Sequence, residues 1–270
     1  NPTEYKGYDV TWEIGRQLAV MHYIDNFVSY PKIEYTYNAD GMITGVRHCY
    51  YILGDTEYYY DSEYIVDGTR VLAYQGGDDR GSFYAEYLYD ESGSPIGMKY
   101  YAYNFETNQR ETECVYYFFE KNIFGDIVGV YDEEGDKVLG FTYDAWGNVS
   151  ITESSEISGL YEGYGTYLKK ACIFRYRGYM YESSSGFYYL QTRFYDPAVG
   201  RFINADGQLN DGLVGYNMYA YCENNPVLYI DPTGNAPKWL KDKIKWFTEN
   251  VAIPLETVVK KTLSEYDLTF

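Results

Sequence analysis

The sequence contains few of the residues on which most hydrolytic enzymes, metal sites and disulfide-stabilised domains depend. There are two histidines, His22 and His48. The four cysteines, which form no close pair, are Cys49, Cys114, Cys172 and Cys222. So few histidines argue against Ser-His-Asp catalysis and histidine-rich metal sites, and zinc knuckles need closely spaced cysteines. We therefore predict neither a metal site nor a bound cofactor, and no dense disulfide framework.

Long apolar runs and an excess of basic residues are also absent. No stretch reaches the roughly 18 apolar residues of a transmembrane helix, so no membrane span is predicted. Acidic residues outnumber basic ones, 40 to 22, and the net charge is -18. This charge argues against nucleic acid as the main partner. The chain begins with Asn1 and shows no signal peptide, so the cellular location is not indicated by its N-terminus.

Tyrosine and glycine are abundant instead. The 270 residues include 37 tyrosines and 26 glycines, and one residue in five is aromatic. Tyrosine and phenylalanine favour half-buried strands, and glycine favours tight turns. The composition therefore predicts a mainly antiparallel β-structure, and we expect residues 1–235 to form one continuous, curved system of hairpins.

A short turn sequence recurs along the first 150 residues. It has the form Tyr-Asp/Asn-x-x-Gly and lies between stretches of alternating apolar residues. The Asp or Asn side chain can accept hydrogen bonds from following backbone N–H groups, and the glycine adopts the left-handed conformation that closes a hairpin. The predicted turn residues are Asp40, Gly41, Asp90, Gly93, Asp132, Gly135, Asp144 and Gly147.

These repeats resemble the YD repeats of the Rhs family, and the stretch from Gly186 to Gly234 resembles the Rhs repeat-associated core. The matching segments are GFYYLQTRFYDP at 186–197, GRFINAD at 200–206, YAY at 219–221 and NPVLYIDPTG at 225–234. TWEIGRQL at 11–18 resembles the Gram-positive, wall-associated branch of the family. The resemblance covers about residues 1–236.

The resemblance implies a fold and a role. Rhs proteins build a β-ribbon that spirals into a hollow shell, the core seals one end, and a variable toxin follows the core. We accordingly expect a YD-repeat region at 1–160, a core at 161–235 and a short α-helical tail at 236–270. The expected partners are the chain's own N-terminal shell, its C-terminal effector segment and an immunity protein. The family implies a secreted or cell-surface location and a role in bacterial competition.

Several family members also cut their own chain once, beside an Asp-Pro-x-Gly motif, by aspartyl-type chemistry. By position, the acids are Asp206 and Asp231, and Arg193 is the supporting basic residue. Cleavage would involve Gly234, Asn235 and Ala236. Two neighbouring carboxyl groups can share one proton and act as acid and base. The same aspartates are also common turn formers, and the arginine could be structural. Asn235 stands where the family has a bulky apolar residue, so we expect slow or absent cleavage.

Two further segments have local patterns. Residues 161–170 contain Gly-x-Gly without the spacing of a phosphate loop, and we expect a flexible glycine loop. From Pro237 a helical pattern begins, with Leu240, Ile244, Phe247 and Val251 on one face. This tail would cap the β-structure, begin a toxin or contact a membrane. An alternative role for the whole chain is carbohydrate binding or adhesion through exposed aromatic residues.

Overall fold

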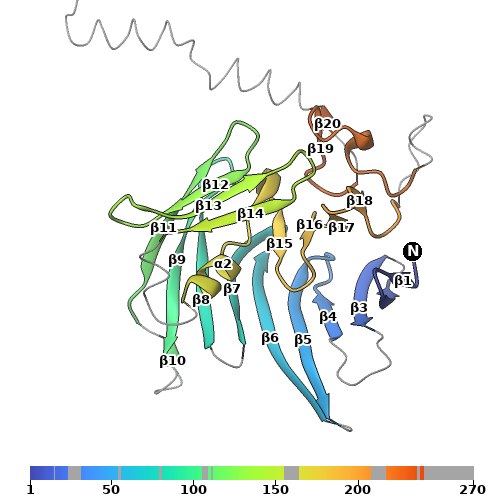
Figure 1. The fold of residues 1–270 in the computed structure, drawn as a ribbon, viewed down its shortest axis with the longest axis horizontal. Coiled ribbons are helices and arrows are strands. Elements are labelled where there is room, and N and C mark those ends of the chain that lie inside the picture. Colours follow the sequence, from blue (N-terminus) through green and yellow to red (C-terminus); the bar gives the residue numbers. More distant parts are fainter. Residues whose placement is uncertain are drawn as a thin grey trace, which may run out of the picture.

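The computed structural model describes residues 1–14, 16–23, 32–53, 56–78, 81–104, 109–110, 112–154, 164–207, 217–235 and 238–239. Strands account for most of this part of the chain, so the expected antiparallel β-fold is confirmed (Figure 1). The strands of the first half are β1 (Glu4–Tyr5), β2 (Tyr8–Glu13), β3 (Gln17–Tyr23), β4 (Lys32–Tyr37), β5 (Ile43–Leu53), β6 (Thr56–Asp67), β7 (Arg70–Asp78), β8 (Gly81–Tyr89), β9 (Pro95–Asn104), β10 (Gln109–Arg110), β11 (Val115–Lys121), β12 (Ile127–Tyr131), β13 (Lys137–Tyr143) and β14 (Val149–Glu153).

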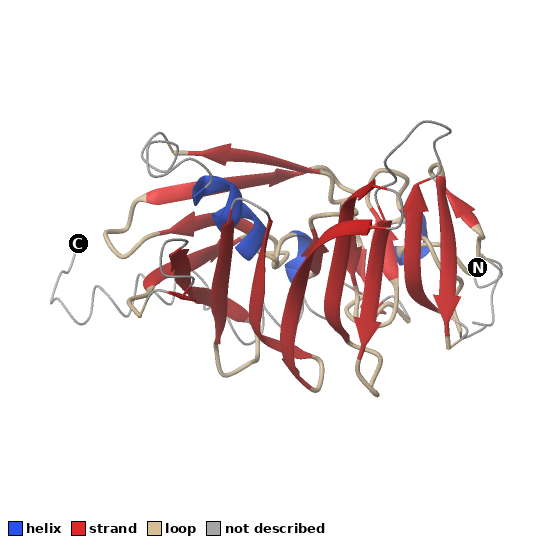
Figure 2. Ribbon diagram, turned by 90° about the horizontal axis from the view of Figure 1, so that it is seen from below, coloured by secondary structure: helices blue, strands red, loops and turns tan. Residues whose placement is uncertain are grey.

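These strands form one antiparallel sheet in which almost every strand pairs with the next along the chain. β9 pairs with β8 and β11, and the short β10 also pairs with β9. Viewed from below, the strands follow one another around a curved wall (Figure 2). The wall is therefore a meander of hairpins, as the repeated turn sequences predicted.

The YD turns have the predicted geometry. In the turn at 144–147, the Asp144 carboxylate accepts hydrogen bonds from the backbone N–H groups of Trp146 and Asn148, at 2.9 and 3.0 Å. Gly147 has φ +94°, a conformation that costs a residue with a side chain about 1–2 kcal/mol. Asp90 and Asp132 act in the same way, each beside a glycine with positive φ. The turn prediction is confirmed.

Two details of these turns differ from the sequence expectation. In the first turn the accepting side chain is that of Asn38, and Asp40 only donates its backbone N–H, because Asn38 occupies the position after the tyrosine. A fifth turn lies at Asn122–Gly125, where Asn122 accepts from two backbone N–H groups. Lys121 replaces the tyrosine there, so the tyrosine-based pattern missed this turn.

The repeat tyrosines connect neighbouring strands. The Tyr37 hydroxyl donates to the carbonyl of Leu18, that of Tyr89 to Val71 and that of Tyr143 to Ile127. Each acceptor lies on or at the edge of the preceding strand. The tyrosine of the motif thus satisfies a main-chain group while its ring covers the sheet.

The second half of the chain does not continue this sheet. The sheet ends at Glu153, and a separate four-stranded sheet comprises β15 (Met180–Glu182), β16 (Phe187–Tyr189), β17 (Phe194–Asp196) and β18 (Arg201–Phe202). Two 3-10 turns, η1 (Tyr176–Gly178) and η2 (Cys222–Asn224), and strand β19 (Tyr229–Ile230) complete this region. The expectation of one continuous sheet through residue 235 was therefore wrong. The strands of the second sheet have only two or three residues and pack against the large sheet instead of extending it.

The expected glycine loop at 161–170 is also corrected, because residues 164–171 form helix α2 (Tyr164–Ala171). The helix packs against the sheet: Leu168 and Ala171 are fully buried. Asp78 of β7 accepts hydrogen bonds from the Tyr167 hydroxyl at 2.7 Å and the Lys170 ammonium at 3.0 Å. Gly81 lies against the Tyr167 ring, where an added Cβ would come within 2.4 Å of it. These tertiary contacts stabilise a helix that local sequence does not predict.

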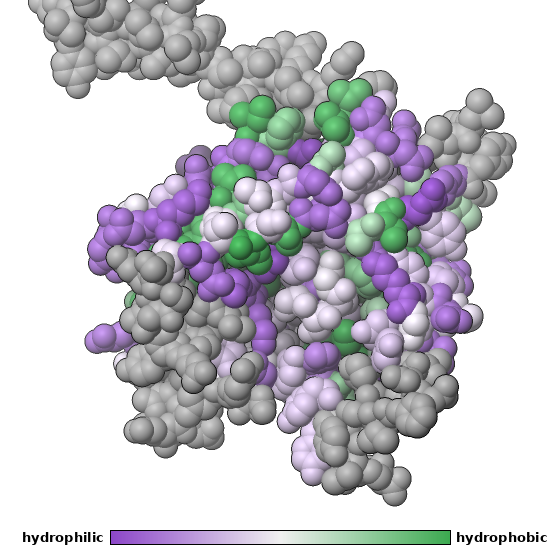
Figure 3. All heavy atoms as spheres, in the orientation of Figure 1, coloured by the Kyte–Doolittle hydropathy of each residue, from purple (hydrophilic) through white to green (hydrophobic). Residues whose placement is uncertain are grey.

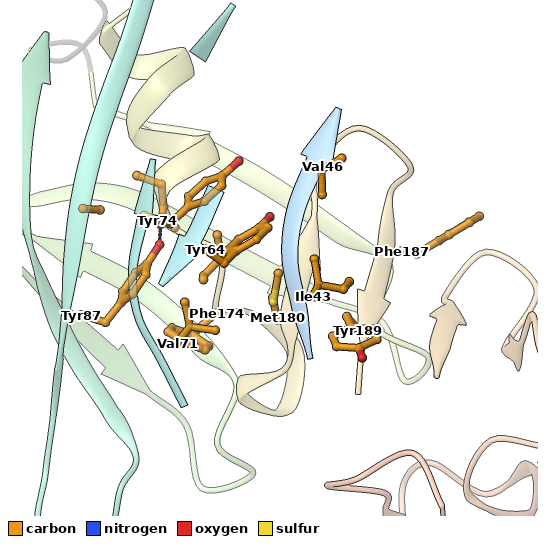
Figure 4. Close-up of a cluster of buried hydrophobic side chains, with 14 of the residues drawn as sticks. Ile43, Val46, Tyr64, Val71, Tyr74, Tyr87, Phe174, Met180, Phe187 and Tyr189 are labelled. Atoms are coloured by element: carbon orange, nitrogen blue, oxygen red, sulfur yellow. Dashed lines mark hydrogen bonds between the residues drawn. The ribbon is translucent and has the colours of Figure 1, made fainter. Parts of the chain in front are cut away.

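Most described tyrosines are packed, as expected for a structural wall. Tyr64 and Tyr74 of the sheet stack with their ring centroids 4.5 Å apart, and the Tyr87 ring meets Phe174 of the second half edge to face at 5.0 Å (Figure 4). A second cluster is formed entirely within the core region and contains Tyr176, Tyr179, Tyr188, Leu190, Tyr195, Phe202, Tyr221 and Cys222. Among the tyrosines whose exposure is described, the exposed ones are Tyr23, Tyr50, Tyr58 and Tyr59. The hydropathy of the visible face is mixed, with polar and apolar residues interspersed (Figure 3).

The start of the tail differs from its helical pattern. Lys238 and Trp239 form strand β20 (Lys238–Trp239), which pairs with Tyr229 and Ile230 of β19. The free edge of β19 offers main-chain hydrogen bonds that an isolated first helical turn would lack. Leu240, Ile244, Phe247 and Val251 lie outside the described residues, so the tail helix stays a prediction. In the described part of the chain, no helix is long and apolar enough to cross a membrane.

Candidate functional site

Arg193 lies at the centre of the candidate site, directly before β17. It is 3% exposed, and its guanidinium carbon lies 3.6 Å from the centroid of the Phe202 ring. Its Nη1 donates to the carbonyl of Met218 at 3.1 Å. Its Nε donates to the carbonyl of Gly234. Arg193 is therefore fixed by aromatic stacking and by two main-chain acceptors.

The two predicted aspartates meet at this guanidinium. Nη2 of Arg193 lies 3.0 Å from Oδ2 of Asp206 and 3.6 Å from Oδ2 of Asp231. Asp231 is 1% exposed, and the side chain of Asp206 is 13% exposed. The structure thus brings together all three residues, which are separated by up to 38 positions in the sequence.

Asp231 also forms the turn that follows it. Its Oδ1 accepts hydrogen bonds from the N–H groups of Gly234 at 2.8 Å and Asn235 at 3.2 Å, with a longer one from Thr233 at 3.4 Å. One oxygen therefore organises the Asp-Pro-Thr-Gly turn, and the other faces the arginine. The catalytic and the turn-forming interpretations of Asp231 are compatible, because they use different oxygens.

Gly234 is required at its position. It has φ +73°, and an added Cβ would lie 2.6 Å from the Leu190 carbonyl oxygen and 2.8 Å from Oγ1 of Thr192. The Thr192 hydroxyl donates to the Thr233 carbonyl at 2.7 Å. The turn before β17 therefore packs directly against the Asp-Pro-Thr-Gly turn, and there is no room for a side chain at position 234.

Burial and the neighbouring charges have opposing effects on the pKa values of Asp231 and Arg193. Burial raises the pKa of Asp231 above its ordinary value, although Arg193 and the three N–H donors act in the opposite direction. Burial also lowers the pKa of Arg193, opposed by the two carboxylates. Burial therefore favours the protonated form of Asp231, whereas the guanidinium and the N–H donors favour its carboxylate.

The peptide between Gly234 and Asn235 is held on both sides. Its carbonyl accepts from Arg193 and its N–H donates to Asp231. Asn235 is half-buried. Ala236 lies outside the described residues, and with it the peptide that follows Asn235.

Several residues that complete the site were not predicted from the sequence. Tyr179 accepts a hydrogen bond from the Asp231 N–H at 3.1 Å, and Met218 accepts from the Asp206 N–H at 2.8 Å. No local signal identifies them, because they reach the site only through the tertiary fold. In the described part of the chain, no cluster of His, Cys, Asp and Glu has the arrangement of a metal site.

Comparisons with known proteins find relatives that match part of the chain. No profile of a known protein family matches the chain. It is 39% identical over 122 residues to the tRNA nuclease WapA of Bacillus subtilis, covering 44% of this chain and 5% of WapA. It is 37% identical over 107 residues to the double-stranded DNA deaminase toxin A of Burkholderia cenocepacia, covering 40% of this chain and 7% of the toxin. The chain is thus similar, over part of its length, to several bacterial toxins.

Solved structures share the fold of this chain. The crystal structure of TcdB2-TccC3 matches 85% of this chain with a TM-score of 0.64 and 18% sequence identity. The Photorhabdus luminescens Tc holotoxin pore with the TccC3 mutation D651A matches 87% with a TM-score of 0.65 and 16% identity. In each case this chain covers 10% of the larger chain. It is thus a small part of the length of the proteins that it resembles.

Proposed function

We propose that this chain closes one end of an Rhs toxin shell and presents the effector segment that follows the core. The observation that carries the proposal is that the core region contacts both ends of the large sheet. Its partners would be further shell hairpins, the effector and an immunity protein, and its location would be secreted or cell-surface. The nuclease and deaminase activities in the relatives' names belong to those proteins.

The first contact joins the core to the beginning of the sheet. Asp196 of β17 binds the Lys6 ammonium at 2.5 Å and accepts from the Tyr5 hydroxyl at 2.8 Å. Asn204 donates its side-chain N–H to the carbonyl of Arg16 at 3.0 Å. These contacts join residues that are 188 to 191 positions apart, so they fix the first strands against the core.

The second contact joins the core to the end of the sheet. The hydroxyls of three core tyrosines donate to consecutive carbonyls of the last YD turn, at 2.7 to 2.9 Å. The pairs are Tyr176 with Ala145, Tyr195 with Trp146 and Tyr188 with Gly147. Figure 1 shows the second sheet lying between the two ends of the curved wall. This position supports a closing role.

Protease protection in the full protein that contains this chain tests the closing role. If the core closes the shell, the polypeptide after residue 239 resists protease in the wild type. Removing the three hydroxyls by Tyr→Phe changes at 176, 188 and 195 should expose it. Equal digestion of wild type and variant would contradict the proposal.

We further propose that the chain cuts itself once, beside Gly234. In this reaction Asp206 removes a proton from a water molecule, whose oxygen attacks the scissile carbonyl carbon. Arg193 donates to that carbonyl oxygen and stabilises its developing negative charge. Asp231 gives its proton to the leaving amide nitrogen, the C–N bond breaks, and a carboxylate and an amine result.

The contacts of the Gly234–Asn235 peptide support this assignment of roles, since the arginine touches its carbonyl and Asp231 its N–H. Intact-mass measurement of the 270-residue chain tests the proposal. Fragments that end at residue 234 or 235 are expected to accumulate slowly, and Asp206→Asn or Asp231→Asn should abolish them. A single stable mass in the wild type under all conditions would contradict self-cleavage.

A further inference from the structure

The backbone of Asp231 is held from a side that the proposed chemistry does not use. Its carboxyl group faces Arg193 and the following turn, whereas its N–H donates to the Tyr179 hydroxyl at 3.1 Å. The next residue is Pro232, which has no N–H to offer. The Tyr179 contact is therefore the hydrogen bond that fixes the start of the Asp-Pro-Thr-Gly turn.

Tyr179 is itself fixed by a second buried tyrosine. The hydroxyls of Tyr179 and Tyr221 share a hydrogen bond of 3.1 Å in which either can donate. Tyr221 has no exposed surface and Tyr179 is 7% exposed. Their rings meet edge to face at 6.4 Å, and Tyr221 also stacks on Tyr195 at 4.0 Å. Neither ring can turn without disturbing the aromatic cluster, so the hydroxyl is pre-positioned beneath Asp231.

We propose that Tyr179, supported by Tyr221, is a positioning residue that holds Asp231 in the geometry needed for self-cleavage. The inference rests on the proposed self-cleavage, which it extends by two residues that lie outside the acid pair. Tyr179 reaches the reacting peptide only through Asp231, and its contact is to the backbone. It therefore sets where the carboxyl group lies instead of taking part in proton transfer.

Removing the Tyr179 hydroxyl would destabilise the present position of Asp231. With phenylalanine at position 179, the Asp231 N–H would lose its acceptor inside the protein, and a buried donor without a partner is unfavourable. The turn would shift to recover a hydrogen bond, carrying Asp231 away from the Gly234–Asn235 peptide. A displacement of about 1 Å is enough to slow a positioned reaction considerably.

A matched pair of variants tests the proposal. Tyr179→Phe and Tyr188→Phe each remove one buried hydroxyl from the same aromatic cluster, but the Tyr188 hydroxyl donates to Gly147 and does not touch Asp231. Cell-free synthesis followed by intact-mass spectrometry gives the cleavage rate of each chain. We expect Tyr179→Phe to be about tenfold slower than Tyr188→Phe. Tyr221→Phe should fall between them, because it leaves the contact to Asp231 in place.

The pH profile separates positioning from simple destabilisation. If Tyr179→Phe lets the Asp231 carboxyl reach water, the pH dependence of the remaining cleavage should move to lower pH. A variant that only folds less well would lose yield without moving the profile. Equal rates and equal profiles for the two Tyr→Phe variants would overturn the inference.

Hydrogen exchange distinguishes failure of this inference from failure of self-cleavage. In an Asp206→Asn background no cleavage is needed, and the amides of 231–235 should exchange faster with Tyr179→Phe than with Tyr188→Phe. If the wild type is never cut but this difference is found, the proposed reaction fails and the positioning of Asp231 stands. If exchange is the same in both variants, Tyr179 does not position Asp231.

Discussion

At the scale of single residues, the site depends on one arginine that serves two acids and a carbonyl. Arg193 contacts Asp206, Asp231 and Gly234 from within the protein. A buried charge needs such compensation, since leaving it unpaired would be strongly destabilising. We therefore expect Arg193 to be as important for folding of this region as for chemistry, and variants of the acids to be the more informative ones.

The raised pKa of Asp231 predicts the direction of the pH dependence. An acid whose pKa is higher in the folded state holds its proton there after the unfolded chain has lost it. Its contribution to stability is therefore present at low pH and is lost as the pH rises through the folded-state pKa. The cleavage rate should fall over the same range, because the proton donor disappears.

Denaturant unfolding measured between about pH 4 and 7 checks this sign. The Asp231→Asn variant should show a flatter pH dependence of the unfolding free energy than the wild type. A wild-type stability that rises more steeply across this range than that of the variant would contradict a raised pKa at Asp231.

Gly234→Ala is predicted to disrupt the site through sterics alone. The new Cβ would meet the Leu190 carbonyl oxygen at 2.6 Å and would require a left-handed alanine. We expect cleavage to be lost and the turn at 231–235 to become accessible to protease. Gly125→Ala is a suitable control, because Gly125 also has positive φ but no atom within 4 Å of the added Cβ. Equal protease resistance of the two variants would contradict the expected clash.

At the scale of elements, the YD turns are separate modules whose surroundings differ. Gly135 and Gly147 both have positive φ, yet only Gly147 contacts the core, where an added Cβ would lie 2.7 Å from the Tyr176 ring. Gly135→Ala should therefore cost only the backbone penalty of about 1–2 kcal/mol. Gly147→Ala should cost about 1–3 kcal/mol more, from overpacking.

Urea denaturation followed by fluorescence measures both free energies of unfolding. Equal destabilisation by the two changes would mean that the last YD turn and Tyr176 do not pack as described. A larger loss for Gly135→Ala would contradict the assignment of its neighbourhood as open.

The hairpin turns could be predicted from the sequence, and helix α2 could not. The hairpin turns were predictable because an Asp or Asn side chain and a glycine suffice to form them locally. The turn at 122–125 was missed only because Lys121 occupies the tyrosine position. Helix α2 was not predictable, because it depends on Asp78, which lies almost 90 residues earlier in the chain.

The residues of the candidate site were likewise predictable only in part. The resemblance to the Rhs core placed Arg193, Asp206 and Asp231 together, and the structure contains that cluster. The turn-forming role of Asp231 follows from local chemistry. Tyr179 and Tyr221 could not be identified among so many tyrosines, because only the fold brings their hydroxyls beneath Asp231.

At the scale of the whole molecule, the core links the two ends of a curved sheet. Asp196 is the buried acceptor for both Lys6 and Tyr5, so Asp196→Ala should free the first strands. We expect faster hydrogen exchange in β1 and β2 and a loss of about 1–3 kcal/mol, because a charge-assisted hydrogen bond is removed. Asp61→Ala is the control, since the Arg47–Asp61 pair lies exposed on β5 and β6. Protection of β1 and β2 that is equal in both variants would contradict the link.

The way in which the core recognises the last turn has a consequence for how these proteins diverge. Its tyrosines donate to the carbonyls of Ala145, Trp146 and Gly147, and Tyr189 donates in the same way to Gly41 of the first turn. Every residue type carries a carbonyl, so these bonds do not depend on the side chains of the turn. Ala145 is exposed and can therefore change without loss of these hydrogen bonds, whereas the Trp146 side chain packs against the aromatic cluster and against Gly200. The interface thus binds the turn mainly through its main chain and constrains the side chain at only one of the two variable positions, Trp146.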